Sequence, residues 1–357
     1  MSGKICYIFL IAVIGIFVLG RFMACNDQEE KDGLLCAPVV IPTLCRYDHF
    51  TQCIESLSRC TWADRTDVYI GLDYPAKESH LEGYNKIKTY LDTCELKFKS
   101  LNVVVRERNY GFGAKGNVAT LQKQVLTQYD RFIMSEDDNV FSPNFLVFMN
   151  KGLEKFKDDK SVFAINGYRH FYPVKMEKNT FLRQNIEFSA WGYGIWRDRV
   201  KNMPPYDYFA NSFTLKKFFD VKKDMGRRRA LNYWDFCFKP IKAWFDVPWS
   251  IYAYLENMDI IMPSEVSLVR NIGWDGSGEH CAGMDDIAQR HLTQKISEKT
   301  DFVFEGTGRE FYAENRAIYR KYSYAKIEGW VFWRRFCKNL LKYFMRKLCG
   351  KGPCGKE

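Results

Sequence analysis

The sequence lacks several features that define common protein classes. Its 357 residues include twelve cysteines but no Cys-x-x-Cys pair, so the spacing of a zinc finger is absent. Only one run is apolar enough to approach a membrane span, which excludes a polytopic transporter. No internal repeat is visible. The chain is not poor in bulky apolar groups, because 16% of its residues are aromatic, and this excludes an intrinsically disordered protein.

The net charge of +10 is concentrated at one end of the chain. Residues 326–357 contain nine Lys or Arg and two Glu, which leaves about +3 for the other 325 residues. A surface that neutralises phosphates along a duplex needs positive charge on the folded domain itself. We therefore expect no nucleic-acid partner.

The cysteines do not decide the cellular compartment. Cys45, Cys53 and Cys60 fall in or near apolar runs, where a free cysteine behaves as a small hydrophobic residue. This favours mostly reduced thiols over disulfides.

The N-terminus carries an uncharged run of 16 residues, Ile5–Gly20. The run is short for a membrane span. Phe22-Met23 nevertheless make a poor signal-peptidase site, and we favour an anchor over a signal peptide or a buried helix. The domain organisation predicted from these features is a membrane anchor or signal segment at 1–25, a linker at 26–33, a catalytic domain at 34–325 and a basic amphipathic tail at 326–357.

Between the two ends, strand and helix patterns alternate. Buried-strand runs are followed by helical spacing of apolar residues, as in Phe50, Cys53, Ile54 and Leu57. Ser142-Pro143 supplies an N-cap and a first helical residue for a further helix. This alternation predicts an α/β fold with a mainly parallel sheet, whose ligands bind at the carboxyl ends of the strands. The predicted strands are 38–46, 67–75, 101–106 and 130–135, and the predicted helices begin at 48, 81, 114 and 142.

Two motifs follow predicted strands. Gly111, Gly113 and Gly116 match the GxGxxG pattern of a dinucleotide site, which leaves NAD binding, a plain turn or a loop near another nucleotide's phosphates as alternatives. Glu136, Asp137 and Asp138 directly follow an apolar strand. Adjacent carboxylates repel one another unless a cation compensates them, so the triplet predicts a divalent metal that also binds a substrate diphosphate, with a solvated acidic turn as the alternative.

The stretch IMSEDDNVFSPNFLVFMNKGLEKF resembles that of GT-A glycosyltransferases, both the protein O-mannose and N-glycan N-acetylglucosaminyltransferase I type and bacterial family-2-like sugar transferases. The resemblance covers roughly 38–280. It implies a Rossmann-like GT-A fold, a nucleotide-sugar donor, usually UDP-linked, and Mn²⁺ or Mg²⁺ as cofactor.

The resemblance also assigns residues. Asp138 matches the metal ligand, and Glu136 and Asp137 match positions near the ribose and the sugar. Arg46 matches a nucleotide contact and Asp73 a base contact; each also fits a plain loop or cap residue. We therefore expect these residues to lie close together in the folded protein.

In the second half of the chain, Phe188–Gly194 resembles the floor of the donor-sugar site, so Trp191 and Gly192 are expected to line it, with an aromatic core as the alternative. The Trp-Asp pair ending in Asp235 resembles the motif that supplies the base of inverting enzymes. A buried structural role and Asp207 as the base remain the alternatives to Asp235. His280 is a candidate further metal ligand, although a loop histidine is the simpler interpretation.

Residues 330–348 have the pattern of a basic amphipathic helix. Such a helix lies in an anionic membrane interface or packs on its own domain, and the N-terminal anchor in the same chain favours the membrane. Its apolar stripe is Trp333, Phe336, Cys337, Leu340, Leu341, Phe344 and Leu348.

Together these features predict a membrane-associated, inverting, metal-dependent glycosyltransferase with a glycan or lipid-linked acceptor. A non-catalytic nucleotide- or glycan-binding protein and an NAD-dependent oxidoreductase are the alternatives. Lys4 and Arg21 flank the apolar run and leave its orientation balanced. We expect a cytoplasmic domain if the source is bacterial, and a Golgi-luminal domain if it is eukaryotic.

Overall fold

The computed structural model describes residues 34–175, 180–239, 241–277, 286–322 and 327–348. The chain divides into two units, Met1–Cys36 and Ala37–Glu357, and the second unit holds every helix and strand of the described residues. The predicted anchor and linker at 1–33 lie outside those residues.

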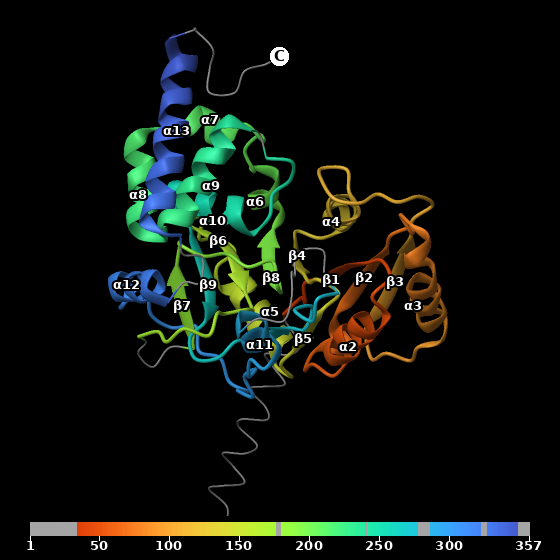
Figure 1. Cartoon of the computed structure of the whole chain (residues 1–357). Helices are drawn as coiled ribbons and strands as arrows, with labels where there is room; N and C mark the ends of the chain where they lie inside the picture. The colour runs from red at the N-terminus through yellow and green to blue at the C-terminus, as the bar shows by residue number, and fades with distance from the viewer. Residues whose placement is uncertain (1–33, 176–179, 240, 278–285, 323–326, 349–357) are drawn as a thin grey trace, which may run out of the picture. The chain divides into compact units, whose positions relative to one another are not determined.

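The described residues form one eight-stranded sheet with the order β3-β2-β1-β4-β8-β6-β9-β7, together with a small ladder of β5 and β10 (Figure 1). The ladders among β1, β2, β3 and β4 are parallel, as predicted. In the second half β8 lies antiparallel to β4 and β6, and β7 antiparallel to β9, so the sheet is mixed there. The strands are β1 (Val39–Thr43), β2 (Asp67–Leu72), β3 (Ser100–Val105), β4 (Arg131–Met134), β5 (Asn139–Phe141), β6 (Val162–Asn166), β7 (Phe181–Gln184), β8 (Tyr193–Trp196), β9 (Asp259–Pro263) and β10 (Val269–Asn271).

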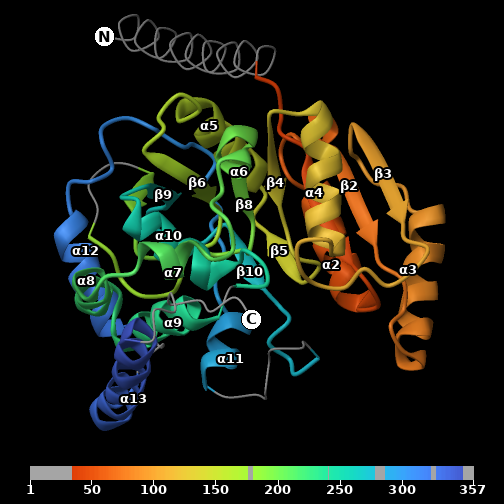
Figure 2. The same ribbon diagram turned by 90° about the horizontal axis from the view of Figure 1, so that it is seen from above.

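The first half alternates strands and helices, and its sheet order reverses between β1 and β4. The apolar residues expected on one side of the first helix, Phe50, Cys53, Ile54 and Leu57, are all fully buried. Helices α2 and α3 cover one face of the sheet and α4 covers the other (Figure 2), as right-handed crossovers in opposite directions require. The helices of this half are α2 (Tyr47–Ser58), α3 (Leu81–Thr93), α4 (Asn117–Gln128) and α5 (Phe145–Lys155).

Two predicted helix starts are shifted, and the first is that of α4, which begins at Asn117 rather than at 114. Helix α5 begins at Phe145 with Asn144 as its N-cap, rather than at Pro143 after a Ser142 cap. The Ser142 hydroxyl instead donates a hydrogen bond to the carbonyl of Ser297, a contact with a distant segment that the local sequence does not encode.

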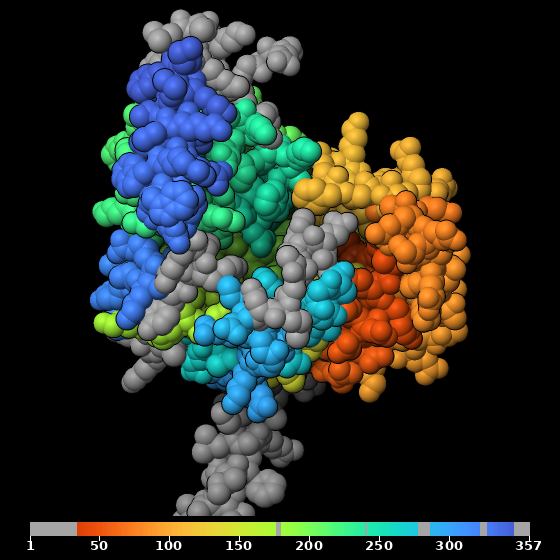
Figure 3. Space-filling model, in the orientation of Figure 1, coloured from red at the N-terminus to blue at the C-terminus, as the bar shows by residue number. Residues whose placement is uncertain are grey.

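The second half adds a layer of helices with its own apolar core. Phe209, Phe218, Trp234 and Phe332 are completely buried in this cluster. Helix α13 packs beside α9 in it and forms part of the molecular surface (Figure 3). The helices of this half are α6 (Arg197–Lys201), α7 (Tyr208–Ser212), α8 (Leu215–Met225), α9 (Arg227–Phe238), α10 (Asp246–Leu255), α11 (Asp286–Leu292), α12 (Tyr312–Tyr322) and α13 (Gly329–Leu348).

Within the described residues, no helix is both long and apolar enough to cross a membrane.

The described residues include cysteines that form no disulfide with one another: Cys36, Cys45, Cys53, Cys60, Cys94, Cys237 and Cys337.

Candidate active site

The acidic triplet lies where the order of the parallel strands reverses. Glu136–Asp138 follow β4, and Arg46 follows β1, which is the neighbour of β4 in the sheet. The carboxyl ends of neighbouring parallel strands at which the strand order reverses are the usual ligand site of an open α/β sheet. The structure therefore brings the predicted residues Arg46, Glu136, Asp137 and Asp138 together.

The guanidinium of Arg46 pairs with two carboxylates of the triplet. Its Nη2 atom contacts Asp137 Oδ1 and lies 2.8 Å from Asp138 Oδ2. The Thr43 hydroxyl donates to Asp137 Oδ2 at 2.9 Å. Both aspartates are buried. Burial raises the pKa of Asp137, and Asp138 raises it further, while Arg46 and Thr43 oppose the rise.

A segment from the second half of the chain closes this site. Strand β10 pairs with β5, and the Asn271 side chain donates to Asp138 Oδ1 at 2.6 Å. A Cβ atom on Gly273 would lie 2.0 Å from Asp138 Oδ2, so only glycine permits this close approach. Asn271 and Gly273 thus orient the predicted metal ligand.

Glu136 is surrounded by carboxylates that Arg46 does not fully balance. Burial raises its pKa well above the usual value, and repulsion from Asp138, Asp246 and Asp137 raises it further. Its Oε2 atom accepts a hydrogen bond of 3.0 Å from the indole Nε1 of Trp191, which places Trp191 beside the acidic triplet.

These residues fit a divalent cation bound together with a substrate. Among the described residues, no group of three or more His, Cys, Asp or Glu side chains is arranged as a metal cage. Mg²⁺ is commonly held by only one or two carboxylates plus substrate phosphates, and Mn²⁺ also prefers oxygen ligands. Asp138 supplies such oxygen atoms, and the surplus negative charge around Glu136 would be relieved by a cation.

A fourth carboxylate, Asp246, lies next to the triplet and was not predicted. It is the first residue of α10, and its Oδ1 atom accepts the amide N–H of Ala190 at 2.8 Å. Because Trp191 binds Glu136, two adjacent residues, Ala190 and Trp191, connect Asp246 to the acidic triplet. Burial raises the pKa of Asp246 to about 6, although Arg229 and His170 lower it.

A buried polar network lies near Asp246. His170 Nε2 lies 2.9 Å from Glu187 Oε1, and the Tyr172 hydroxyl donates to the other oxygen of Glu187. Burial alone would raise the pKa of Glu187, but His170 and Tyr172 outweigh it and hold that pKa below the usual value. Glu187 is therefore held in its ionised form.

Asp73 organises the glycine loop. Its carboxylate accepts the backbone N–H groups of Tyr74, Tyr110 and Gly111 at 3.0, 2.8 and 2.9 Å. Two amides of the GxGxxG loop are thus bound to a carboxylate of the protein itself, whereas a dinucleotide site uses such amides to bind phosphate. The geometry favours a structural turn over the NAD interpretation.

Replacing Asp73 with alanine is expected to lower the free energy of unfolding by about 1–3 kcal/mol, because loop amides lose their acceptor. Asp73→Asn, which keeps one acceptor oxygen, should cost less. Urea denaturation measures both variants. A variant of wild-type stability with weakened nucleotide binding would instead support the predicted base contact.

Two further predicted site residues, Asp235 and Gly192, make other contacts, and a third is not described. Asp235 lies on α9, is about half exposed, and pairs with Arg335 of α13 at 2.8 Å, so the structure does not bring it to the triplet. Gly192 has a φ of +72°, and a Cβ there would lie 2.9 Å from a methyl group of Val269, which gives this glycine a packing role. His280 lies outside the described residues.

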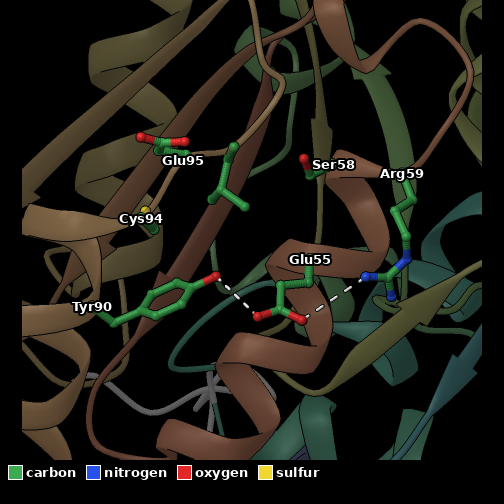
Figure 4. Close-up of a pocket in the computed structure, with 7 residues that line it drawn as sticks. Glu55, Ser58, Arg59, Tyr90, Cys94 and Glu95 are labelled. Atoms are coloured by element: carbon green, nitrogen blue, oxygen red, sulfur yellow. Dashed lines mark hydrogen bonds and ion pairs between the residues drawn. The ribbon is translucent and has the colours of Figure 1, made fainter.

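A separate surface pocket lies between α2 and α3 (Figure 4). Tyr90 donates to Glu55 Oε1 at 3.3 Å, and Arg59 lies 3.9 Å from Glu55 Oε2. None of the residues that line this pocket belongs to the acidic triplet, and no function is assigned to it.

Sequence reasoning missed Asp246, Asn271 and Gly273. The only local signal of Asp246 is an acid at the start of an apolar helical segment, which is typical of an ordinary helix cap. The contacts of Asn271 and Gly273 with Asp138 depend on the pairing of β10 with β5.

The comparisons with known proteins give low similarity. No family model and no curated protein matches the chain. Solved structures that match include S. aureus TarS at 15% identity, covering 66% of this chain and 36% of that one, with a TM-score of 0.33. TarS residues 1–349 match at 12% identity, with 72% and 69% coverage and a TM-score of 0.36.

A third match is the mannosyltransferase PcManGT of Pyrobaculum calidifontis, solved with GDP-Man and Mn²⁺. Its identity is 13%, the coverage is 73% of this chain and 68% of that one, and the TM-score is 0.30. This chain thus spans about a third of full TarS and about two thirds of the other two. Because these TM-scores are below 0.5, the function is argued from the residues of the site.

Proposed function

We propose that this protein is a metal-dependent, inverting glycosyltransferase that uses a nucleotide-diphosphate sugar, with UDP-sugars favoured. The observation that carries the proposal is the bridge of Ala190 and Trp191, which sets Asp246 beside the acidic triplet. The acidic triplet is suited to a cation and a diphosphate, and the carboxylate of Asp246 has a pKa near neutrality.

An inverting transfer needs one carboxylate that removes the proton of the acceptor hydroxyl as this oxygen attacks the anomeric carbon. Asp246, rather than Asp235, is the proposed base, because a pKa of about 6 leaves it ionised at neutral pH yet basic enough to accept a proton. The Ala190 amide orients its carboxylate. Product formation then breaks the bond between the sugar and the diphosphate, without a protein nucleophile.

The leaving diphosphate requires positive charge. Arg46 lies at the carboxyl end of β1 and contributes its guanidinium, while Asp138 would hold Mn²⁺ or Mg²⁺. The bound ion would stabilise the negative charge that develops on the diphosphate. Trp191, held by Glu136, presents an indole at this point and is proposed to contact the donor sugar. The acceptor is proposed to be a glycan or a lipid-linked sugar.

The test uses the full chain with UDP-, GDP- and CMP-sugars in the presence of Mn²⁺ or EDTA. One diphosphate sugar is expected to raise the Tm and to be hydrolysed slowly, only with the metal. Asp138→Asn should lose both effects, while Asp158→Asn, which removes an exposed carboxylate elsewhere, should keep them.

Other outcomes contradict the proposal. Donor binding without release of the diphosphate indicates a binding protein. Stabilisation by NAD that ignores Mn²⁺ and survives Asp138→Asn indicates an oxidoreductase.

A further inference from the structure

Helix α13 uses only part of its surface to pack on the domain. Phe332 and Phe336 are buried in the helical core, where the Phe336 ring lies 5.3 Å from that of Phe218 and 5.4 Å from that of Trp234. Leu340 and Tyr343 pack against the same cluster. One side of α13 is thus fixed to α8 and α9.

A second side of α13 is apolar and exposed. At about 100° per residue, the exposed apolar residues of this side fall within an arc of roughly 120° around the helix axis, next to the buried side. A contiguous apolar patch of this kind marks an interaction surface. We call it the outer strip: Trp330, Trp333, Leu341, Phe344 and Met345, with exposed fractions of 63, 46, 67, 48 and 57%.

The outer strip is bordered by positive charge. Arg334, Lys338 and Lys342 are exposed and recur every four residues, so they form one row along the helix. The segment 329–348 contains six Lys or Arg and no acidic residue. The apolar stripe predicted from the sequence is therefore split: Phe336 and Leu340 belong to the core, and the outer strip stays at the surface.

The apolar outer strip next to the basic row favours one kind of binding partner. A second copy of α13 would bring two basic rows together, which like-charge repulsion opposes. A bilayer with anionic headgroups binds the outer strip and the basic row at the same time. The aromatic and aliphatic side chains enter the membrane interface, and the lysines and the arginine contact the phosphates. Tryptophan also favours the level of the headgroups.

We propose that α13 docks the protein on an anionic lipid surface through the outer strip and its basic row. Because Phe332 and Phe336 fix the helix to the domain, docking holds the whole domain at the membrane in one orientation. This inference does not depend on the proposed glycosyltransferase activity.

The chain offers a selective probe of this contact. Trp330 and Trp333 are the exposed ones among the nine tryptophans, all of which are described, and the apolar N-terminal run contains none. Quenching of tryptophan fluorescence by brominated phosphatidylglycerol therefore reports on α13 and not on the N-terminal run. Brominated phosphatidylcholine serves as the neutral comparison.

For the full chain we expect strong quenching by the anionic vesicles and little by the neutral ones. Lys338→Glu with Lys342→Glu should raise the lipid concentration at half-maximal quenching at least about tenfold. Lys88→Glu with Lys123→Glu, an equal charge change on the exposed sides of α3 and α4, should leave it within about twofold. Leu341→Ser with Phe344→Ser should also weaken quenching, at unchanged Tm.

The proposal is overturned by equal quenching on neutral vesicles, by quenching that survives the Lys338 and Lys342 substitutions, or by no quenching at all. Concentration-dependent self-association without lipid that protects both tryptophans would assign the outer strip to a second copy of the chain. None of these measurements requires a donor or turnover.

Discussion

Asp246→Asn is expected to lower kcat of sugar transfer by about 10²–10⁴-fold while leaving donor binding intact, because the amide cannot accept the proton of the acceptor hydroxyl. The substitution keeps the shape of the side chain, and its amide oxygen can still accept the Ala190 N–H, so the Tm should not fall. Initial rates and donor titration measure the two effects separately.

Asp235→Asn is the matched control. Asp235 pairs with Arg335 on the exposed side of α9, so kcat should change less than about twofold, as for a surface ion pair. If Asp235→Asn lost activity and Asp246→Asn kept it, the assignment of the base to Asp246 would be wrong.

The same residue predicts the acid limb of the pH profile. Asp246 accepts a proton only when ionised, and its pKa is about 6, above the usual value for aspartate. The value of kcat/KM should therefore fall as the pH drops below about 6, or below a lower value once a bound cation favours the ionised form. A rate that stays constant down to pH 4.5 would exclude Asp246 as the base.

The second large effect is expected from Arg46→Met. Removing the guanidinium leaves Asp137 and Asp138 buried without their cationic partner, which should lower the free energy of unfolding in EDTA by about 3–5 kcal/mol. Added Mn²⁺ should restore part of this loss, because a divalent ion replaces the missing positive charge. Urea denaturation with and without the metal checks both statements.

Arg335→Met provides the comparison for Arg46→Met. It also removes an arginine from an ion pair with aspartate, but both side chains are more than 40% exposed, so the loss should be below about 1 kcal/mol and independent of Mn²⁺. Equal losses for the two variants would show that the Arg46 pair has no special role in the stability of the site.

The sequence by itself determined the local elements of the first half and the position of the acidic triplet. Apolar runs bounded by polar loops gave β1, β2 and β4, and the helical spacing of Phe50, Cys53, Ile54 and Leu57 gave α2. Because Glu136 follows such a run, its place at the carboxyl end of a strand needed no tertiary information. These features are local, and side-chain periodicity reports local structure directly.

Only the tertiary structure places Asp246, and not Asp235, beside the acidic triplet. They are 11 residues apart, and each follows an aromatic residue, Trp234 or Phe245, so local chemistry does not separate them. Trp234 is buried in the helical core, which directs Asp235 to α13, whereas α10 packs on the sheet and brings Asp246 to Ala190.

The two sides of α13 give the same lesson. Periodicity identified an apolar stripe, but the packing of α8 and α9 decided that Phe336 is buried and Trp333 is exposed. Periodicity fixes which side chains share a face of a helix; which neighbour covers that face depends on contacts between segments about a hundred residues apart, such as Arg335 with Asp235 and Asp138 with Asn271.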